Sequence, residues 1–348
     1  ELIRSVRSGP ACVDFTRGAW VSTVLAVKGL VLLFVLAAAV GCTDSNTSNT
    51  GGTGGAGGDA GAPGMGGAGG MAFSPDPPLV IGTDERPAEV AIPRNYDPDT
   101  TYPLLVVLHG RGADGRTQAG YFQLFPLVDT KQFVMIYPDG GTFNSSGERV
   151  WNGAVCCAEP DDPIDDVGYI SDLIDEAKTT YNVDPGRVYL MGHSNGGFMS
   201  FRMACEASDH FTAMLSLAGS TWDDTELCQP GTPAVSVLVV HGTSDETVLY
   251  EGGIFESMDE SRRYPGAVEL SERSAETAGC DPGTTTDVGT LDLVPMLEGE
   301  ETERSGYQDG CDEGLEVELW TVRDGPHIPF FSQDFSEQAL DWLFRQSR

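Results

Sequence analysis

A serine, an aspartate and a histidine stand in this chain in the order and the local settings that acyl transfer to a serine requires. Ser194 lies within Gly192-His-Ser-Asn-Gly196, which fits the pattern G-x-S-x-G of a nucleophile elbow. The pattern places the serine on a tight turn from strand to helix, and the glycines leave room for that turn. The N–H groups at the start of the following helix favour negative charge that develops during a reaction. We therefore predict that Ser194 is a nucleophile, against the alternative of a glycine-rich turn in a chain with 44 glycines.

Two further residues complete a catalytic set when the chain is followed onward from Ser194. A predicted strand runs into His241-Gly-Thr-Ser-Asp245, and the last predicted strand ends just before His327. Of the five histidines, only His327 lies after Asp245. The order serine, acid, histidine is that of the α/β-hydrolases, so we predict Asp245 as the acid and His327 as the general base. Glu246 and Asp259 stand near Asp245 and remain alternatives for the acid.

A loop that follows another predicted strand, His109-Gly-Arg-Gly112, has the form expected for an oxyanion hole. Such a loop supplies one backbone N–H, and the residue after the nucleophile supplies the other. We expect these donors at Arg111 or Gly112 and at Asn195. His327 would take the proton from the serine as its hydroxyl attacks an ester carbonyl, and water would later release the acyl group.

The elements that must position these residues follow from the apolar pattern after residue 79. Segments rich in Val, Ile and Leu alternate with amphipathic segments, which is typical of a mostly parallel sheet with helices on both faces. We therefore predict an α/β protein with the α/β-hydrolase fold. Ligands of such sheets bind at the carboxyl ends of the strands, where the catalytic candidates lie. The predicted strands are Glu89–Ile92, Leu104–Leu108, Phe133–Tyr137, Val188–Met191, Met214–Leu217, Val235–Val240 and Val317–Val322.

Three helices can be placed on this scheme. A helical run from Phe198 to Cys205 follows the elbow, and another from Phe335 to Phe344 ends the chain. Apolar residues at intervals of three and four between Val167 and Tyr181 predict a helix that begins after Asp165-Asp166. These carboxylates suit a helix N-terminus. Calcium binding by Asp161-Asp-Pro-Ile-Asp-Asp166 is the alternative, and we favour capping.

The first part of the chain has the composition of an export signal and a linker. Residues Gly29 to Val40 form an apolar run that is too short to span a bilayer and suits a signal-peptide core. Ala39-Val-Gly-Cys42 resembles a bacterial lipoprotein box, in which Cys42 would carry lipid; ordinary secretory cleavage is the alternative. The 12 glycines among residues 51 to 70 predict a flexible tether. We assign 1–42 to the signal, 43–78 to the tether and 79–348 to one catalytic domain.

The cysteines agree with an extracellular or cell-surface location. Eight are present, and six lie in the predicted domain. An even number in an exported protein favours three disulfides, although spacing does not fix their pairing. We expect Cys280 to pair with Cys311, and the adjacent Cys156 and Cys157 to pair with Cys205 and Cys228 in some order. Zinc is the competing use, but the chain has no C-x-x-C pair, so we expect no metal.

The charge of the chain excludes some classes of partner. A formal net charge of −33 argues against binding to nucleic acid or to an anionic membrane surface. The carboxylates are spread through the domain, so the default interpretation is a solvated acidic surface. The partner that the motifs predict is instead a small or polymeric ester substrate.

Several motifs together give the domain a family resemblance. They are Leu108-His-Gly-Arg-Gly, Tyr137-Pro-Asp-Gly, Trp151-Asn-Gly-Ala-Val-Cys-Cys, Asp165-Asp-Val-Gly-Tyr-Ile, Gly192-His-Ser-Asn-Gly-Gly and His241-Gly-Thr-Ser-Asp. On these motifs, residues 80 to 345 resemble the polyhydroxybutyrate depolymerase and feruloyl esterase group of secreted α/β-hydrolases. The resemblance implies a triad at Ser194, Asp245 and His327, cysteine bridges, and hydrolysis of esters on or within polymers without a cofactor.

The segment around His327 departs from the family pattern and leaves the substrate open. Many members carry Gly-Gly-Gly-His followed by Thr-Trp-Pro, whereas this chain has Asp324-Gly-Pro-His-Ile-Pro-Phe330. Our first hypothesis is a serine esterase that acts on plant-polymer esters such as feruloylated xylan. Polyhydroxybutyrate is the alternative substrate, and a non-catalytic surface protein that binds a glycan or a partner is the alternative function. Candidates for an aromatic acyl pocket, with core or lid packing as the alternative for each, are Phe143, Trp151, Trp222, Tyr250 and Phe330.

Overall fold

The computed structural model describes residues 72–157, 163–229, 231–255, 259–307 and 309–348. The predicted export signal with Cys42, nearly all of the predicted tether, and Asp161-Asp162 of the calcium alternative lie outside these ranges. No helix within them has both the length and the apolar character needed to cross a membrane.

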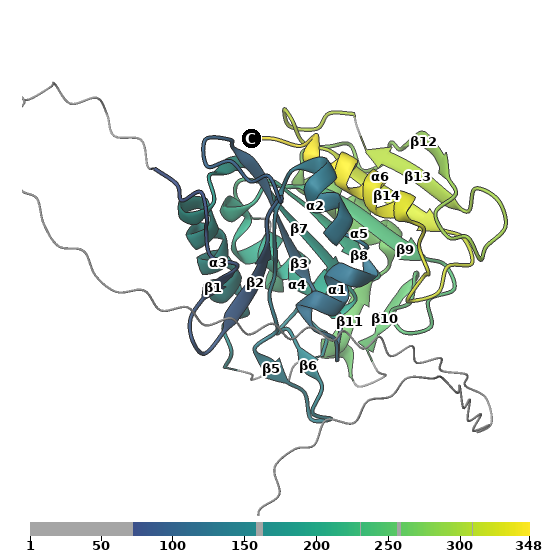
Figure 1. Ribbon diagram of the computed structural model, residues 1–348. Coiled ribbons are helices and arrows are strands. Elements are labelled where there is room, and N and C mark those ends of the chain that lie inside the picture. Colours follow the sequence, from purple (N-terminus) through teal and green to yellow (C-terminus); the bar gives the residue numbers. More distant parts are fainter. Residues whose placement is uncertain (1–71, 158–162, 230, 256–258, 308) are drawn as a thin grey trace, which may run out of the picture. The chain divides into compact units, whose positions relative to one another are not determined.

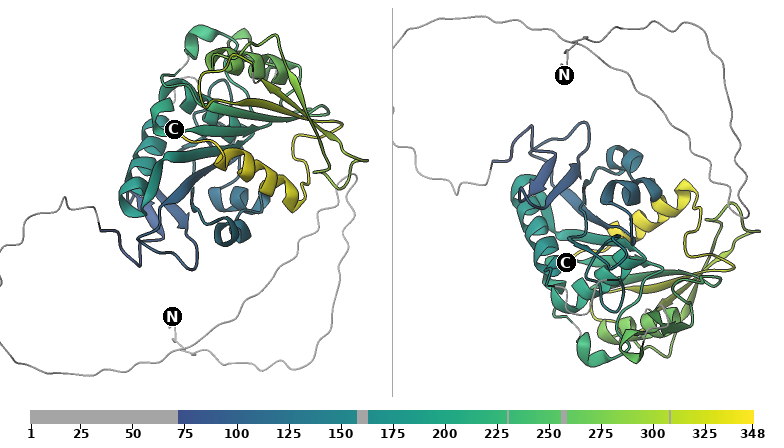
Figure 2. Two further views of the ribbon diagram at one scale, coloured as in Figure 1. Left: turned by 90° about the horizontal axis from the view of Figure 1, so that it is seen from above. Right: turned by 90° about the horizontal axis from the view of Figure 1, so that it is seen from below.

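A single sheet organises the described domain, with helices packed on both of its faces (Figures 1 and 2). Its strand order in the described residues is β1-β2-β4-β3-β7-β8-β9-β14-β13-β12. The bounds of these strands are β1 Val80–Gly82, β2 Pro87–Ala91, β3 Tyr102–Leu108, β4 Val134–Tyr137, β7 Val183–His193, β8 Ala213–Leu217, β9 Ser236–Gly242, β12 Thr286–Leu291, β13 Thr302–Tyr307 and β14 Val317–Val322. Two hairpins stand apart from it: β5 Thr142–Phe143 with β6 Arg149–Val150, and β10 Gly252–Ile254 with β11 Arg263–Pro265.

The central strands are parallel and the outer strands are antiparallel. The run β4-β3-β7-β8-β9-β14 pairs in parallel throughout. These are the strands that the apolar segments predict, with β2 added at one edge. The antiparallel β1, β12 and β13 were not predicted from the sequence. Because the parallel strands end at the same edge, the loops that leave β3, β7, β9 and β14 gather there.

Two layers of helices bury the two faces of this sheet. Alternate residues of β3 point to opposite sides, so that Leu104 and Val106 join one core and Leu105 and Val107 join the other. One layer consists of α3 Asp166–Thr180, α4 Asn195–Glu206 and α5 Ala267–Thr277. The other consists of α1 Gly115–Tyr121, α2 Phe125–Lys131 and α6 Gln333–Phe344. The three helices predicted from the sequence correspond to α3, α4 and α6.

Three disulfides lie in the described domain, and one of the predicted pairings is present. Cys280 bonds to Cys311 as expected. The other pairing is wrong, because Cys156 bonds to its neighbour Cys157 and Cys205 bonds to Cys228. Because Cys156 and Cys157 bond to each other, neither is available to Cys205, whose Cα lies 5.2 Å from that of Cys228, within the range that a disulfide spans.

A buried ion pair joins the start of α3 to the edge of the sheet. Asp165 caps the helix by accepting the Gly168 N–H at 2.8 Å, and the side chain of Asp166 is fully buried. The Asp166 carboxylate accepts the Arg86 guanidinium and the Asn152 N–H, each at 2.7 Å. Capping and ion pairing therefore account for both aspartates, and through Asn152 the pair also fixes the loop that leads to the vicinal disulfide.

Replacing Asp166 tests how much this ion pair contributes to the stability of the fold. We expect Asp166→Ala to lower the free energy of unfolding by about 3 kcal/mol, because it leaves the Arg86 charge without its buried partner. Denaturation in urea measures the loss. The control is Asp175→Ala on the same helix, whose carboxylate is 60% exposed and whose loss should stay within about 0.5 kcal/mol. Equal losses in the two variants would contradict this role for Asp166.

Candidate active site

The turn between β7 and α4 holds Ser194 in the conformation of a nucleophile elbow. The serine has φ of 54°, a left-handed value that is uncommon for a residue with a side chain. Its N–H donates to the Leu217 carbonyl at 2.8 Å, which ties the turn to β8. A β-carbon at Gly192 would collide with the Gly196 carbonyl, and one at Gly196 would collide with the end of β3. Both glycines are therefore required by the tightness of the turn.

The structure brings the three predicted triad residues into one hydrogen-bonded chain. His327 Nε2 lies 2.9 Å from Ser194 Oγ, and His327 Nδ1 lies 2.7 Å from Asp245 Oδ2. Ser194 and Asp245 are both buried. This is the geometry in which an imidazole can take the serine proton while a carboxylate fixes its tautomer.

The surroundings of Asp245 stabilise its ionised form. Its Oδ1 accepts the backbone N–H groups of Thr247 and Val248, at 2.8 and 2.9 Å. Burial alone would raise the pKa of this carboxyl, but hydrogen bonds from His241 and His327 outweigh burial and hold the pKa well below its usual range. The carboxylate is therefore charged whenever the neighbouring imidazole needs an acceptor.

Side chains from distant parts of the chain hold the loop that carries His327. His193 Nε2 lies 3.0 Å from the His327 carbonyl. The Tyr121 hydroxyl donates to the Pro329 carbonyl at 2.8 Å, and the Gln123 amide donates to the Phe331 carbonyl at 3.0 Å. The sequence interpretation missed these three positioning residues, because no local pattern marks a side chain whose task is to bond a carbonyl more than 130 positions away.

The structure separates the two alternatives for the oxyanion loop. Gly112 N–H donates to the Arg149 carbonyl at 2.8 Å, so the expectation of a donor at Gly112 is wrong for this conformation and Arg111 is the remaining proposal. Asn195 is the first residue of α4, where a backbone N–H has no acceptor within the helix. Its side chain is fixed by Trp151, whose N–H it accepts at 2.7 Å and whose carbonyl it bonds at 3.0 Å.

His109 shapes the same loop from within. Its Nε2 accepts the Gly140 N–H at 2.9 Å, which leaves Nδ1 to donate to the Gly110 carbonyl at 2.8 Å. Burial lowers the pKa of His109, so the ring stays neutral and keeps this pair of bonds.

The predicted aromatic acyl pocket is not formed by all of its candidates. Trp151 is fully buried against His109 and is part of the core. Tyr250 bonds Thr321 Oγ1 at 2.7 Å and packs edge-on against His241, so packing accounts for it. Phe330 is 72% exposed on the His327 loop and remains a candidate for substrate contact.

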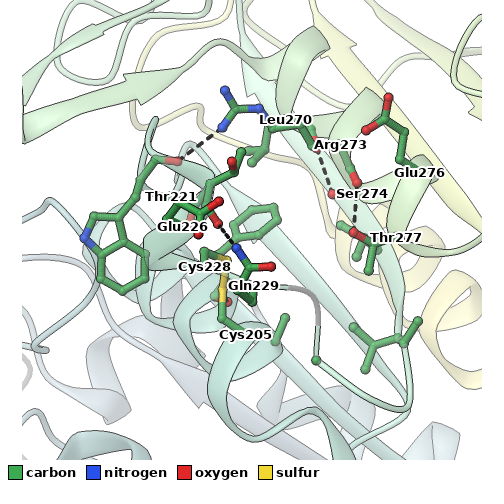
Figure 3. Close-up of a pocket in the computed structure, with 18 residues that line it drawn as sticks. Cys205, Thr221, Glu226, Cys228, Gln229, Leu270, Arg273, Ser274, Glu276 and Thr277 are labelled. Carbon is green, nitrogen blue, oxygen red and sulfur yellow. Dashed lines mark hydrogen bonds between the residues drawn. A yellow bond between two sulfur atoms is a disulfide. The ribbon is translucent and has the colours of Figure 1, made fainter.

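Trp222 instead lines a cavity of about 380 Å³ that contains none of the triad residues. The cavity lies between α4, α5 and the Cys205–Cys228 disulfide (Figure 3). Its wall on α4 begins at Phe201, seven residues after Ser194, which is about 10 Å along the helix axis. The triad geometry decides where ester chemistry can occur, so this cavity does not hold the reacting serine, and contact of Trp222 with an acyl group stays a prediction.

The buried His193 beside the nucleophile makes stability depend on pH. Burial, aided by the positive charge of His327, lowers the pKa of His193 from 6.5 to about 4. Between these values the unfolded chain binds a proton that the folded chain does not, so the free energy of unfolding decreases as pH falls. We expect a loss of about 3 kcal/mol from this group between pH 7 and about pH 4, measured by urea denaturation.

A His193→Asn variant is the control for that loss. It should show a smaller decrease over the same pH range, although not none, because the lowered pKa of His109 acts with the same sign. An unchanged pH dependence in the variant would show that His193 is not the group responsible.

Comparison with known proteins agrees with this geometry. Residues 83–264, just over half of the chain, match a family model described as "Putative esterase". The chain is 26% identical over 254 residues to feruloyl esterase D of Neurospora crassa, which covers 69% of this chain and 73% of that protein. This similarity confirms the resemblance to the feruloyl esterase group.

Two further proteins show how far the similarity extends. The chain is 30% identical over 166 residues to the bifunctional acetylxylan esterase/xylanase XynS20E of Neocallimastix patriciarum, and spans 22% of its length. The structure of an acetyl xylan esterase from Aspergillus awamori aligns over 75% of this chain and 94% of its own, with a TM-score of 0.54 at 14% identity. That likeness confirms the predicted α/β-hydrolase fold. On the extent of the family match, this chain belongs to the esterase family.

Proposed function

We propose that this protein is an exported serine esterase that cleaves ester bonds on xylan, in the manner of a feruloyl esterase. The observation that carries the proposal is the hydrogen-bonded chain from Ser194 through His327 to Asp245. The similarity to feruloyl esterase D and to an acetylxylan esterase supports the choice of a xylan ester.

The proposed reaction uses the chain's own groups throughout. His327 Nε2 takes the proton as Ser194 Oγ attacks the carbonyl carbon, and the N–H of Asn195, with a second donor at Arg111, stabilises the oxyanion. The same imidazole then gives its proton to the departing alcohol, which leaves an acyl group on the serine. A water molecule releases that group by the reverse sequence, and Asp245 stabilises the imidazolium in both halves.

The proposal includes export of the chain. The three disulfides of the described residues fit an oxidising compartment outside the cytoplasm. Attachment of lipid at Cys42, within the predicted signal, is a further part of the proposal and rests on the sequence alone. Mass spectrometry of the protein isolated from its host membrane distinguishes a lipidated Cys42 from ordinary cleavage.

Turnover of methyl ferulate by residues 72–348 tests the proposal. We expect Ser194→Ala to lower kcat by at least about 10⁴-fold, because the acyl-enzyme can no longer form. The matched control is Ser261→Ala, which removes an exposed hydroxyl and should leave kcat as it is. Equal rates for the parent and Ser194→Ala would refute the catalytic proposal and leave a surface-binding protein. Activity on polyhydroxybutyrate granules with none on methyl ferulate would replace xylan esters by the polyester as substrate.

The tether of the His327 loop gives a second test of the mechanism. We expect Tyr121→Phe, which loses the bond to the Pro329 carbonyl, to lower kcat by about 5-fold with KM nearly unchanged, because the imidazole samples positions away from the serine. Tyr189→Phe is the control, since it removes a buried hydroxyl bond from β7 to the Gln346 carbonyl near the end of the chain. The same loss in both variants would mean that general destabilisation, and not the position of His327, sets the rate.

A further inference from the structure

A charged hollow of about 770 Å³ opens beside the loop of the proposed oxyanion hole. Its walls are the β5–β6 hairpin, the strand β2, the start of α1 and the loop at Gly112. Gly110 lies two residues before that wall, and a β-carbon built on Gly110 would lie 3.5 Å from the β-carbon of Ser194. Two residues span at most about 7 Å, so the hollow begins within that distance of the loop's contact with the serine.

Ion pairs line much of this hollow, beside a few apolar side chains, and disfavour a ligand that is wholly apolar. Arg116 pairs with Glu89, and Arg149 pairs with Asp139. Glu148 lies beside Gly112 and within 3.5 Å of the Arg111 guanidinium. An aromatic acyl group placed here would remove water from these charges and return no hydrogen bonds, which is unfavourable.

The same groups suit a ligand rich in hydroxyls. A carboxylate offers about four acceptor positions and a guanidinium five donors, so an ion pair that uses one or two of them still has capacity for a ligand. Each ligand hydroxyl can donate to a carboxylate and accept from a guanidinium at the same time. Recognition of this kind is selective for sugars, because an apolar ligand of equal size cannot make these bonds.

The sign of the charge selects among sugars. The wall contains four carboxylates and two guanidinium groups, and the chain as a whole has a net charge of −33. A uronate or a phosphorylated sugar would meet unfavourable potential at this wall, so a neutral glycan is the ligand that the charges favour.

Phe143 supplies a surface for the apolar face of such a sugar. Its side chain is 59% exposed at the rim, on the short strand β5, and the Arg149 guanidinium lies 5.6 Å from the centre of its ring. Exposure of a large aromatic side chain to water is unfavourable, and a pyranose has one face of C–H groups that can cover it.

We propose that this hollow, with Phe143 at its rim, binds neutral sugar residues of the polymer that carries the ester. The proposal rests on the proposed esterase function, which is what makes this polymer a substrate. Binding of the sugar residues does not itself require turnover. It assigns Phe143 to the carbohydrate, and not to the aromatic acyl pocket that the sequence suggested.

Binding of an unesterified neutral xylo-oligosaccharide to the Ser194→Ala protein tests the site directly, by calorimetry. Adding Phe143→Ala should raise Kd at least about 5-fold, which corresponds to a loss of about 1 kcal/mol. The control is Met296→Ala, an exposed apolar side chain between β12 and β13 at the opposite edge of the sheet, which should change Kd less than about 2-fold. Both side chains are exposed, so the variants should fold normally.

Two outcomes overturn the proposal. One is an equal Kd with and without Phe143, and the other is an oligosaccharide of glucuronate units that binds as tightly as the neutral one. In the active protein, Phe143→Ala should lower kcat/KM for a feruloylated oligosaccharide at least about 5-fold more than for methyl ferulate. Absence of ester turnover with normal oligosaccharide binding would count against the esterase function alone, and turnover of methyl ferulate without oligosaccharide binding would count against the hollow alone.

Discussion

The contact between His327 and Ser194 is the constraint on which the rest of the site depends, because the two residues belong to strands that are not neighbours. β7 carries the serine, and β14 lies three positions away from it, about 14 Å at the usual spacing of strands. The loop after β14 therefore has to cross the ends of β9 and β8. It does so while bonded to the loop after β9, where Thr243 Oγ1 accepts the Asp324 N–H at 2.8 Å, and to side chains from the elbow and from the end of α1.

The carboxylates at this edge of the sheet are stabilised in two different ways. Asp245 is buried, so its charge is tolerable only with the backbone and imidazole donors that surround it. The carboxylates of Glu89 and Asp139 in the hollow are 47% and 40% exposed, so water stabilises their charge together with their arginine partners. The first arrangement fixes one proton donor at one distance, as catalysis requires. The second leaves groups that can exchange water for another hydroxyl, as reversible binding requires.

The sequence predicted the parts of this fold that have a local signal. Most of the parallel strands contain an apolar run because both faces of the sheet are covered, and the elbow has a pattern of glycines that few other turns need. β12 and β13 lie at one edge of the sheet and much of their surface is in water. They therefore contain many polar residues, and no apolar run indicates them in the sequence. The disulfide pairing and the role of Tyr121 depend on which distant segments come into contact. The spacing of residues along the chain does not indicate those contacts.

The order of the strands also determines how a polymer can lie on the site. His327 reaches the serine from the β9 and β14 side, and the proton that it holds must go to the departing alcohol, so the sugar that bears the ester lies beside His327. The charged hollow lies on the opposite side of Ser194, next to β3 and β4. A single sugar cannot occupy both places, whereas a chain of sugars that crosses the serine can. The proposed site therefore fits an ester on a polymer better than an ester of a small alcohol.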